Sequence, residues 1–225
     1  YWVAAPLCIL LVAGLGAALH VVVIAPLLSG APINQLLATG GVLFVLQSFA
    51  TVAFGIDFRN LGIRLPVLAL GEMHFSYARL LAFGAALIGM VAVYLFMTRT
   101  YTGTAIRAIA QDRQIMALMG VDTKKIYLVT SALGGGLAGL AACLLVLQYD
   151  VHPFVGLSFG PITFLICVLG GLGNFVGGFV AAFLFAEIIS LGGLFSDLEW
   201  GYVLAFAFFI VMMFIRPAGL LAKRS

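Results

Sequence analysis

The side chains that most often carry catalysis are scarce and scattered in this sequence. His20, His74 and His152 are far apart and form no His-Glu-x-x-His pattern, so a zinc peptidase site has no support. Glu187 is the sole acidic residue of the range 151–196, whereas acid chemistry inside a membrane calls for two carboxylates at the same depth. The sequence therefore argues against an enzyme.

Two glycine clusters, Gly134–Gly136 and Gly170–Gly178, could be mistaken for phosphate-binding loops. A P-loop needs a lysine directly after its last glycine, and the sequence has no lysine between Lys125 and Lys223. We expect no ATP hydrolysis and no cofactor in this chain. The three cysteines lie singly in apolar stretches and are expected to be small buried hydrophobes.

Polar side chains within the apolar stretches are the better lead to function. They are Asn34, Gln35, Thr39, Gln47, Ser48, Thr51, Thr130, Ser131, Thr163, Asn174 and Glu187. Hydroxyls at such positions usually bond to the carbonyls of their own helix. Amides and acids pair inside the bundle or line a water-filled path, and the sequence leaves both open for Gln47, Asn174 and Glu187.

The main polar segment covers residues 98–125 and carries five basic and two acidic residues. The excess of Lys and Arg predicts that it lies in the cytoplasm. Thr104 is expected to cap one helix, Asp112 a second, and Gly120 to end that second helix.

Apolar residues recur at helical spacing along this segment. They are Ile106, Ile109, Ile115, Met116 and Met119. A narrow apolar face of this kind suits docking into a groove on another protein. The alternative is a helix lying on anionic lipid, held by Arg107 and Arg113.

The elements that position these residues must span a membrane. The first 56 residues contain no Asp, Glu, Lys or Arg, and the chain is 64% hydrophobic and only 8% charged. A soluble domain of this composition could not wet its surface, and the net charge of +3 is too small for a nucleic-acid surface. The first residue is Tyr rather than Met, which leaves room for a further N-terminal segment, so any span count is a minimum.

Charge-free stretches of suitable length predict an all-α polytopic transmembrane bundle that forms a single domain over residues 1–225. The expected spans are Pro6–Leu28, Ile33–Gly55, Leu80–Thr98, Ile126–Tyr149 and Tyr202–Ile215. Small residues four positions apart predict close helix contacts at Ala85 and Gly89, Gly135 and Gly139, and Gly173 and Gly177.

The range Val151–Ala186 holds 36 residues without a charge, too many for one upright span and too few for two full spans and a turn. Its central glycines weaken a helix, so we expect a broken or re-entrant, glycine-rich helix here. Asp150 lies in a loop without Lys or Arg and is expected outside, while Arg216, Lys223 and Arg224 are expected inside. The chain must then cross an odd number of times after Asp150.

The polar segment also resembles the coupling loop of Liv-type permeases, the membrane subunits of branched-chain amino acid ABC importers. The matching positions are Gly103, Ala105, Arg107, Ala108, Gln111, Asp112, Ala117, Gly120 and Val121. Three further blocks follow in the same order as in that family: Ser131–Ala141, Val168–Asn174 and Arg216–Leu220.

The resemblance implies a permease subunit in the inner membrane. Its expected partners are a second permease subunit, alike or different, two cytoplasmic ATPase subunits that bind ATP and Mg, and an external substrate-binding protein. Arg107 would anchor the ATPase contact, Ala108 and Ala117 would permit close approach, and Ile109 and Met116 would enter the partner's groove.

Related permeases carry branched-chain amino acids, urea or short amides, and the sequence does not separate these substrates. An ion- or proton-coupled secondary transporter and a membrane scaffold that docks a soluble partner are the alternatives.

Overall fold

The structure is a computed structural model that describes residues 3–28, 30–60, 67–70, 73–171, 173–195, 198–216 and 219–220. The contacts within the chain divide it into two compact units, residues 1–153 and residues 154–225. Each unit is described by itself. The inside position of the C-terminus was predicted from Arg216, Lys223 and Arg224, of which Lys223 and Arg224 lie outside the described residues.

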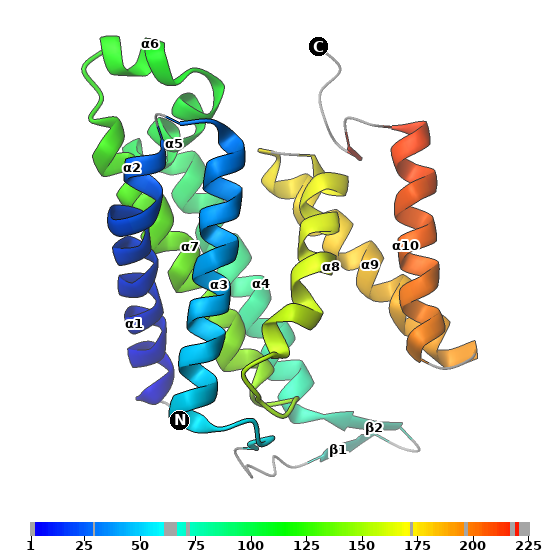
Figure 1. The fold of residues 1–225 in the computed structure, drawn as a ribbon. Helices are drawn as coiled ribbons and strands as arrows, with labels where there is room; N and C mark the ends of the chain where they lie inside the picture. The colour runs from blue at the N-terminus through cyan, green and yellow to red at the C-terminus, as the bar shows by residue number, and fades with distance from the viewer. Residues whose placement is uncertain are drawn as a thin grey trace. The chain divides into compact units, whose positions relative to one another are not determined.

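The first unit is built mainly of long apolar helices (Figure 1). Its elements are α1 (Ala4–Leu19), a π-helical turn η1 (His20–Ile24), α2 (Ala25–Leu27), α3 (Pro32–Phe54), β1 (Val67–Leu70), β2 (Met73–Ser76), α4 (Tyr77–Arg99), α5 (Tyr101–Gln111), α6 (Arg113–Leu118) and α7 (Thr123–Leu145). The four predicted spans of this unit all appear as helices, with ends within a few residues of those expected.

Helices α1 and α7 make the most intimate contact of this unit. A Cβ atom placed on Gly135 would lie 2.5 Å from the carbonyl oxygen of Val12, and one on Gly139 would lie 3.1 Å from the Cα atom of Ile9. Only glycine permits backbones to approach so closely, which confirms the predicted contact of Gly135 and Gly139. Gly89 of α4 faces the side chain of Leu140 in α7.

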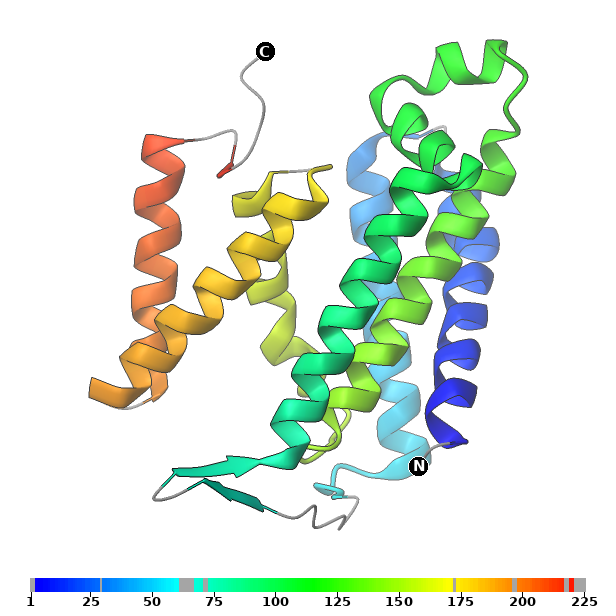
Figure 2. The same ribbon diagram turned by 180° about the vertical axis from the view of Figure 1, so that it is seen from behind.

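A short antiparallel hairpin of β1 and β2 lies at the end of the unit opposite α5 and α6, as both views show (Figures 1 and 2). It falls in the predicted polar excursion, and helical periodicity alone gave no sign of it. Next to it, Arg59 and Val151 exchange two backbone hydrogen bonds of 2.9 Å, and Asn60 Nδ2 donates to Asp150 Oδ1 at 2.9 Å. These bonds tie the loop after α3 to the loop after α7.

In the part of the second unit that the structure describes, the helices are α8 (Val155–Gly170), α9 (Phe175–Phe195) and α10 (Leu198–Ile215). Its core consists of Leu169, Ala181, Phe185 and Ala205, each at most 2% exposed. A Cβ atom on Gly170 would lie 2.5 Å from the Cα of Gly178, so the ends of α8 and α9 meet backbone to backbone.

The glycine-rich segment separates α8 from α9. Gly171 and Gly173 have φ values of +89° and +87°, a left-handed backbone that residues with a side chain rarely adopt. Gly173 therefore lies in a turn rather than on a helix face, and its predicted helix-face pairing with Gly177 is wrong. Helix α8 is about 24 Å long, shorter than a hydrocarbon core of about 30 Å. A re-entrant course in the bilayer remains a prediction.

Within the part of the chain that the structure describes, five helices are long and apolar enough to cross a membrane. Large apolar side chains on them face outward, among them Val52 at 88% and Ile88 at 70% exposure. Such surfaces are stable in lipid rather than in water. The chain is a multi-pass membrane protein with a polytopic helical bundle.

Candidate functional site

The polar segment folds as two short helices, α5 and α6, which we call, together with the turn at Met119 and Gly120, the α5–α6 elbow (residues 101–120). It begins at Thr100, whose hydroxyl accepts a 3.0 Å hydrogen bond from the Gly103 N–H and donates one of 2.7 Å to the Phe96 carbonyl. The predicted cap, Thr104, is wrong because its hydroxyl bonds inside α5 to the Thr100 carbonyl at 3.1 Å. The helix thus starts one turn earlier than expected.

Gly103 lies at the corner between α4 and α5. A Cβ atom at this position would overlap the Phe96 carbonyl oxygen and lie 2.5 Å from the Met97 Cα. The glycine lets α5 fold back against the end of α4. Gly103 was predicted to belong to a partner contact, and the structure shows that the fold of this chain also needs a glycine there.

The inner face of the elbow packs against the start of α7. Ala105 is 4%, Ile109 6% and Ile126 9% exposed, and together they form a small apolar cluster. Met116 of α6 and Tyr127 of α7 pack against its edge. Ile109 and Met116, expected to enter a partner's groove, thus face their own chain in this structure.

Asp112 and Gly120 begin and end α6 as the sequence predicted. The Ile115 N–H donates to Asp112 Oδ1 at 3.0 Å, the side-chain bond typical of an N-cap. Gly120 has a φ of +81°, and the Gly120 and Val121 N–H groups donate to the Ala117 and Met116 carbonyls at 3.2 Å each. A left-handed glycine with such bonds is a common helix ending.

Part of the exposed face of the elbow, its outer face, is apolar. Leu118 is 88%, Met119 73% and Ile115 54% exposed, which sequence periodicity could not distinguish from the buried positions. The side chains of Arg107, Gln111 and Ala117 are also exposed, whereas Ala108 is half-buried. The predicted contact residues therefore divide between an inner face and an outer face.

Asp122 caps the start of α7, next to the elbow. Its Oδ1 accepts a 3.3 Å hydrogen bond from the Lys125 N–H, and its Oδ2 lies 3.3 Å from Lys125 Nζ. The backbone hydrogen bond from Lys125 is the main cause that lowers the pKa of Asp122 below its ordinary value, and the ammonium group of Lys125 adds to it. The carboxylate thus stays ionised where the helix needs an acceptor.

Of the candidates for a pathway, Gln47 belongs to the first unit, and Asn174 and Glu187 belong to the second. Gln47 is half-buried on α3, and its carbonyl accepts the Thr51 hydroxyl at 2.8 Å. Asn174 Oδ1 accepts a 3.0 Å bond from the Gly177 N–H and so caps α9, and Glu187 is exposed about 20 Å further along that helix. Their lining of a pathway remains a prediction.

Hydroxyl groups in the spans bond to their own helices, as expected. Thr39, Thr130 and Thr163 donate to the carbonyls of Gln35, Ile126 and Phe159 at 2.8–2.9 Å. Among the described residues, no group of three or more His, Cys, Asp or Glu side chains could hold a metal ion.

Comparison with known proteins gives one family match and several relatives. The family model described as "Branched-chain amino acid transport system / permease component" matches residues 1–213. The chain is 33% identical over 150 residues to the high-affinity branched-chain amino acid transport system permease protein BraD of Pseudomonas aeruginosa, covering 66% of this chain and 48% of that protein. It is 28% identical over 137 residues to LivH of Escherichia coli, covering 60% and 44% of the two chains.

An archaeal relative is similar to a comparable extent. The probable branched-chain amino acid transport permease protein LivH of Methanocaldococcus jannaschii is 27% identical over 138 residues, covering 58% of this chain and 44% of that protein. The chain thus spans about half the length of the curated relatives it matches. No solved structure matches it.

Proposed function

The chain belongs to the family of branched-chain amino acid transport permease components, and from this membership we propose that it is a membrane-spanning subunit of an ABC importer in the inner membrane. The match over residues 1–213 carries the proposal, because it includes the long apolar helices and the α5–α6 elbow. An ion- or proton-coupled secondary transporter is not favoured by this membership.

The proposed substrates are branched-chain or related amino acids, the class for which the relatives are named. The proposed partners are a second permease subunit, two ATPase subunits and an external binding protein. ATP and Mg would bind to the ATPase subunits, which leaves this chain to form part of the path and to receive mechanical work.

The α5–α6 elbow is the proposed contact with an ATPase subunit. Its outer face presents three exposed apolar side chains, Ile115 and Leu118 of α6 and Met119 directly after it, on a helix that is capped at both ends. Burial of these side chains in a groove would remove apolar surface from water, which favours association. We therefore assign the outer contact to this face.

The inner face of the elbow is the proposed link to the spans. Ala105 and Ile109 are packed on Ile126 of α7, and Gly103 holds α5 against α4 at Met97. Because packed interiors transmit displacement with little compression, a shift of α6 would move α4 and α7 with it. Ile109 and Met116 then act inside the chain rather than in the partner's groove.

A transport assay with the complete assembly tests this function. ATP-dependent uptake of radiolabelled leucine is measured in proteoliposomes with wild-type protein, Leu118→Asp and the conservative variant Leu118→Met. We expect Leu118→Asp to reduce co-purification of the ATPase and uptake by about tenfold or more, since a charge cannot enter an apolar groove, and Leu118→Met to retain both. Uptake by this chain alone under an ion gradient would contradict the proposal.

A further inference from the structure

A cavity of about 410 Å³ lies beside the α5–α6 elbow, between η1, α2 and the start of α7. It is lined by His20, Val21, Ala25, Leu28, Arg113, Lys124, Lys125, Tyr127 and Leu128. All of these residues belong to the first unit. We propose that this cavity binds the phosphate group of an anionic phospholipid headgroup.

The charge of the lining favours an anion. Arg113, Lys124 and Lys125 contribute three positive charges, and none of the described residues that line the cavity is acidic. Asp122 balances one of them through its ion pair with Lys125. The structure gives no acidic partner for Arg113 or Lys124 within the described residues, so an excess of positive charge remains at the cavity.

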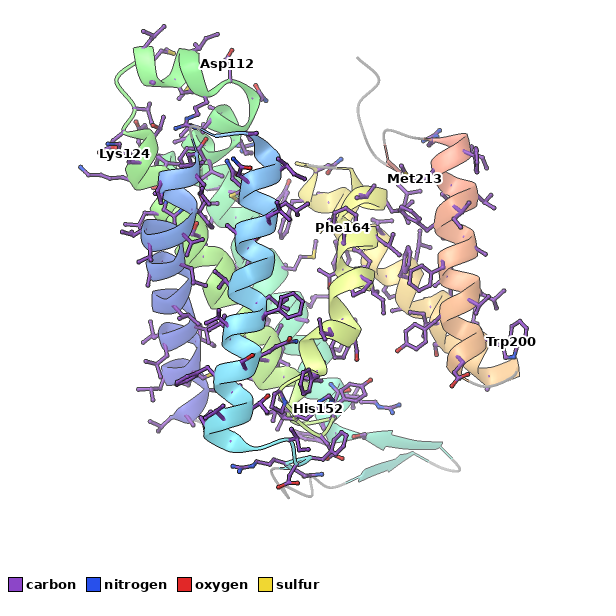
Figure 3. All side chains as sticks on the ribbon, viewed as in Figure 1. Asp112, Lys124, His152, Phe164, Trp200 and Met213 are labelled. Atoms are coloured by element: carbon purple, nitrogen blue, oxygen red, sulfur yellow. The ribbon has the colours of Figure 1, made fainter. Side chains whose placement is uncertain are left out.

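The position of the lysines strengthens the argument. Lys124 and Lys125 are the second and third residues of α7, where the positive end of the helix dipole disfavours basic side chains. Figure 3 shows Lys124 at the same end of the unit as Asp112 of the elbow. An anion bound here would interact favourably with both the lysines and the helix start.

Aromatic contacts connect three of the residues that line the cavity. The guanidinium carbon of Arg113 lies 5.3 Å from the centre of the Tyr127 ring, and the ring of His20 stacks on Tyr127 at 6.1 Å with an angle of 24°. His20 is only 5% exposed. Arg113 is thereby held over the cavity, which reduces the conformational entropy lost when it binds a phosphate.

The apolar part of the lining favours a lipid over a soluble phosphate. Val21, Ala25, Leu28 and Leu128 line the cavity together with the basic residues, and Val21 is 58% exposed on an apolar span. A headgroup placed among the lysines would leave its acyl chains along this surface. Basic cavities between spans at the cytoplasmic side are a recurring form of lipid headgroup site.

Lipid retention by the complete protein tests the site. The protein is purified in detergent, supplied with equal amounts of phosphatidylglycerol and phosphatidylcholine, and examined by native mass spectrometry. We expect one phosphatidylglycerol to be retained in preference to phosphatidylcholine, and the double variant Arg113→Gln/Lys124→Gln to lose this preference by about tenfold or more. The matched control is Arg99→Gln/Arg107→Gln, which removes two charges outside the cavity and is expected to retain it.

Variants of Tyr127 distinguish binding in this cavity from non-specific attraction of anionic lipid to basic side chains. Tyr127→Phe keeps the ring beneath Arg113 and should keep the lipid, whereas Tyr127→Leu should weaken retention. Circular dichroism and gel filtration check that each variant is folded.

A second experiment adds inorganic phosphate at millimolar concentration. If phosphate abolishes the preferential retention of phosphatidylglycerol, the cavity is assigned to a soluble phosphate and the lipid assignment is overturned. Equal retention of both lipids, or equal loss in the two double variants, would overturn the site.

Discussion

Gly135 of α7 and Gly16 of α1 lie directly against each other. A Cβ atom on Gly135 would be 3.2 Å from the Gly16 Cα, and one on Gly16 would be 2.6 Å from the Ser131 carbonyl oxygen. The two backbones therefore pack without any side chain between them. This contact joins the first helix of the unit to the helix that receives the elbow.

We expect Gly135→Ala to separate α1 from α7 and to lower the thermal stability of the protein in detergent. The added methyl would meet the Val12 carbonyl, a backbone atom that cannot move away without moving its helix. The control is Gly134→Ala, whose Cβ would meet nothing within 4 Å. Alanine favours a helix over glycine by about 1 kcal/mol, so the control should be neutral or stabilising. Equal melting temperatures for both variants would contradict the close contact.

The corner at Gly103 gives a second prediction. Gly103→Ala should displace α5 from the end of α4 because its Cβ would overlap the Phe96 carbonyl. We expect leucine uptake by the complete assembly to fall about tenfold or more while the protein remains in the membrane. Gly84→Ala in α4, with open space at the Cβ position, is the control and should transport normally.

The two faces of the elbow should respond differently to truncation. Ile109→Ala removes a side chain that is 6% exposed and should cost about 2–5 kcal/mol of stability, whereas Leu118→Ala changes a side chain that is 88% exposed and should cost less than about 0.5 kcal/mol. Denaturant or thermal unfolding of the purified chain measures both. Similar losses for the two variants would show that α5 is not packed as described.

The cap at Asp122 predicts a pH dependence. Its pKa is lowered in the folded protein, so the ionised cap stabilises the start of α7 at a pH above the ordinary value of 3.8. This contribution is lost as the pH falls through the lowered pKa. We expect the amide of Lys125 to lose protection from hydrogen exchange in that range, and Asp122→Asn, which caps without ionising, to remove the pH dependence. Unchanged protection in the wild type would contradict the cap.

Local chemistry made some of these features predictable. Asp112 and Gly120 act on the backbone next to them, so their roles follow from residue type and spacing. The charge-free stretches predicted the four spans of the first unit, whereas Tyr202–Ile215 is not among the five described helices long enough to cross a membrane and Phe175–Leu194 is. Thr104 was chosen wrongly because Thr100, Thr102 and Thr104 offer equivalent side chains. The helix starts at Thr100, where Gly103 packs against the end of α4. That contact cannot be inferred from the spacing of residues in the sequence.

Tertiary contacts decided the rest. Whether Ile109 or Leu118 is buried depends on where α7 lies, and α7 is positioned by its glycines against α1. The cavity beside Tyr127 joins residues about a hundred positions apart in the chain, from His20 to Leu128. No periodicity links residues at that separation.

The π-helical turn at His20–Ile24 has a consequence for how the first helix can change. In this turn the Ala25 N–H donates to the His20 carbonyl, which accommodates one more residue than an α-helical turn. Because the turn takes up that extra residue locally, deletion of a single residue here would restore a regular helix and keep Ala25 and Leu28 on nearly the same face relative to Gly16. The first helix could therefore lose one residue at this place and keep both its seam with α7 and the direction of its last turn.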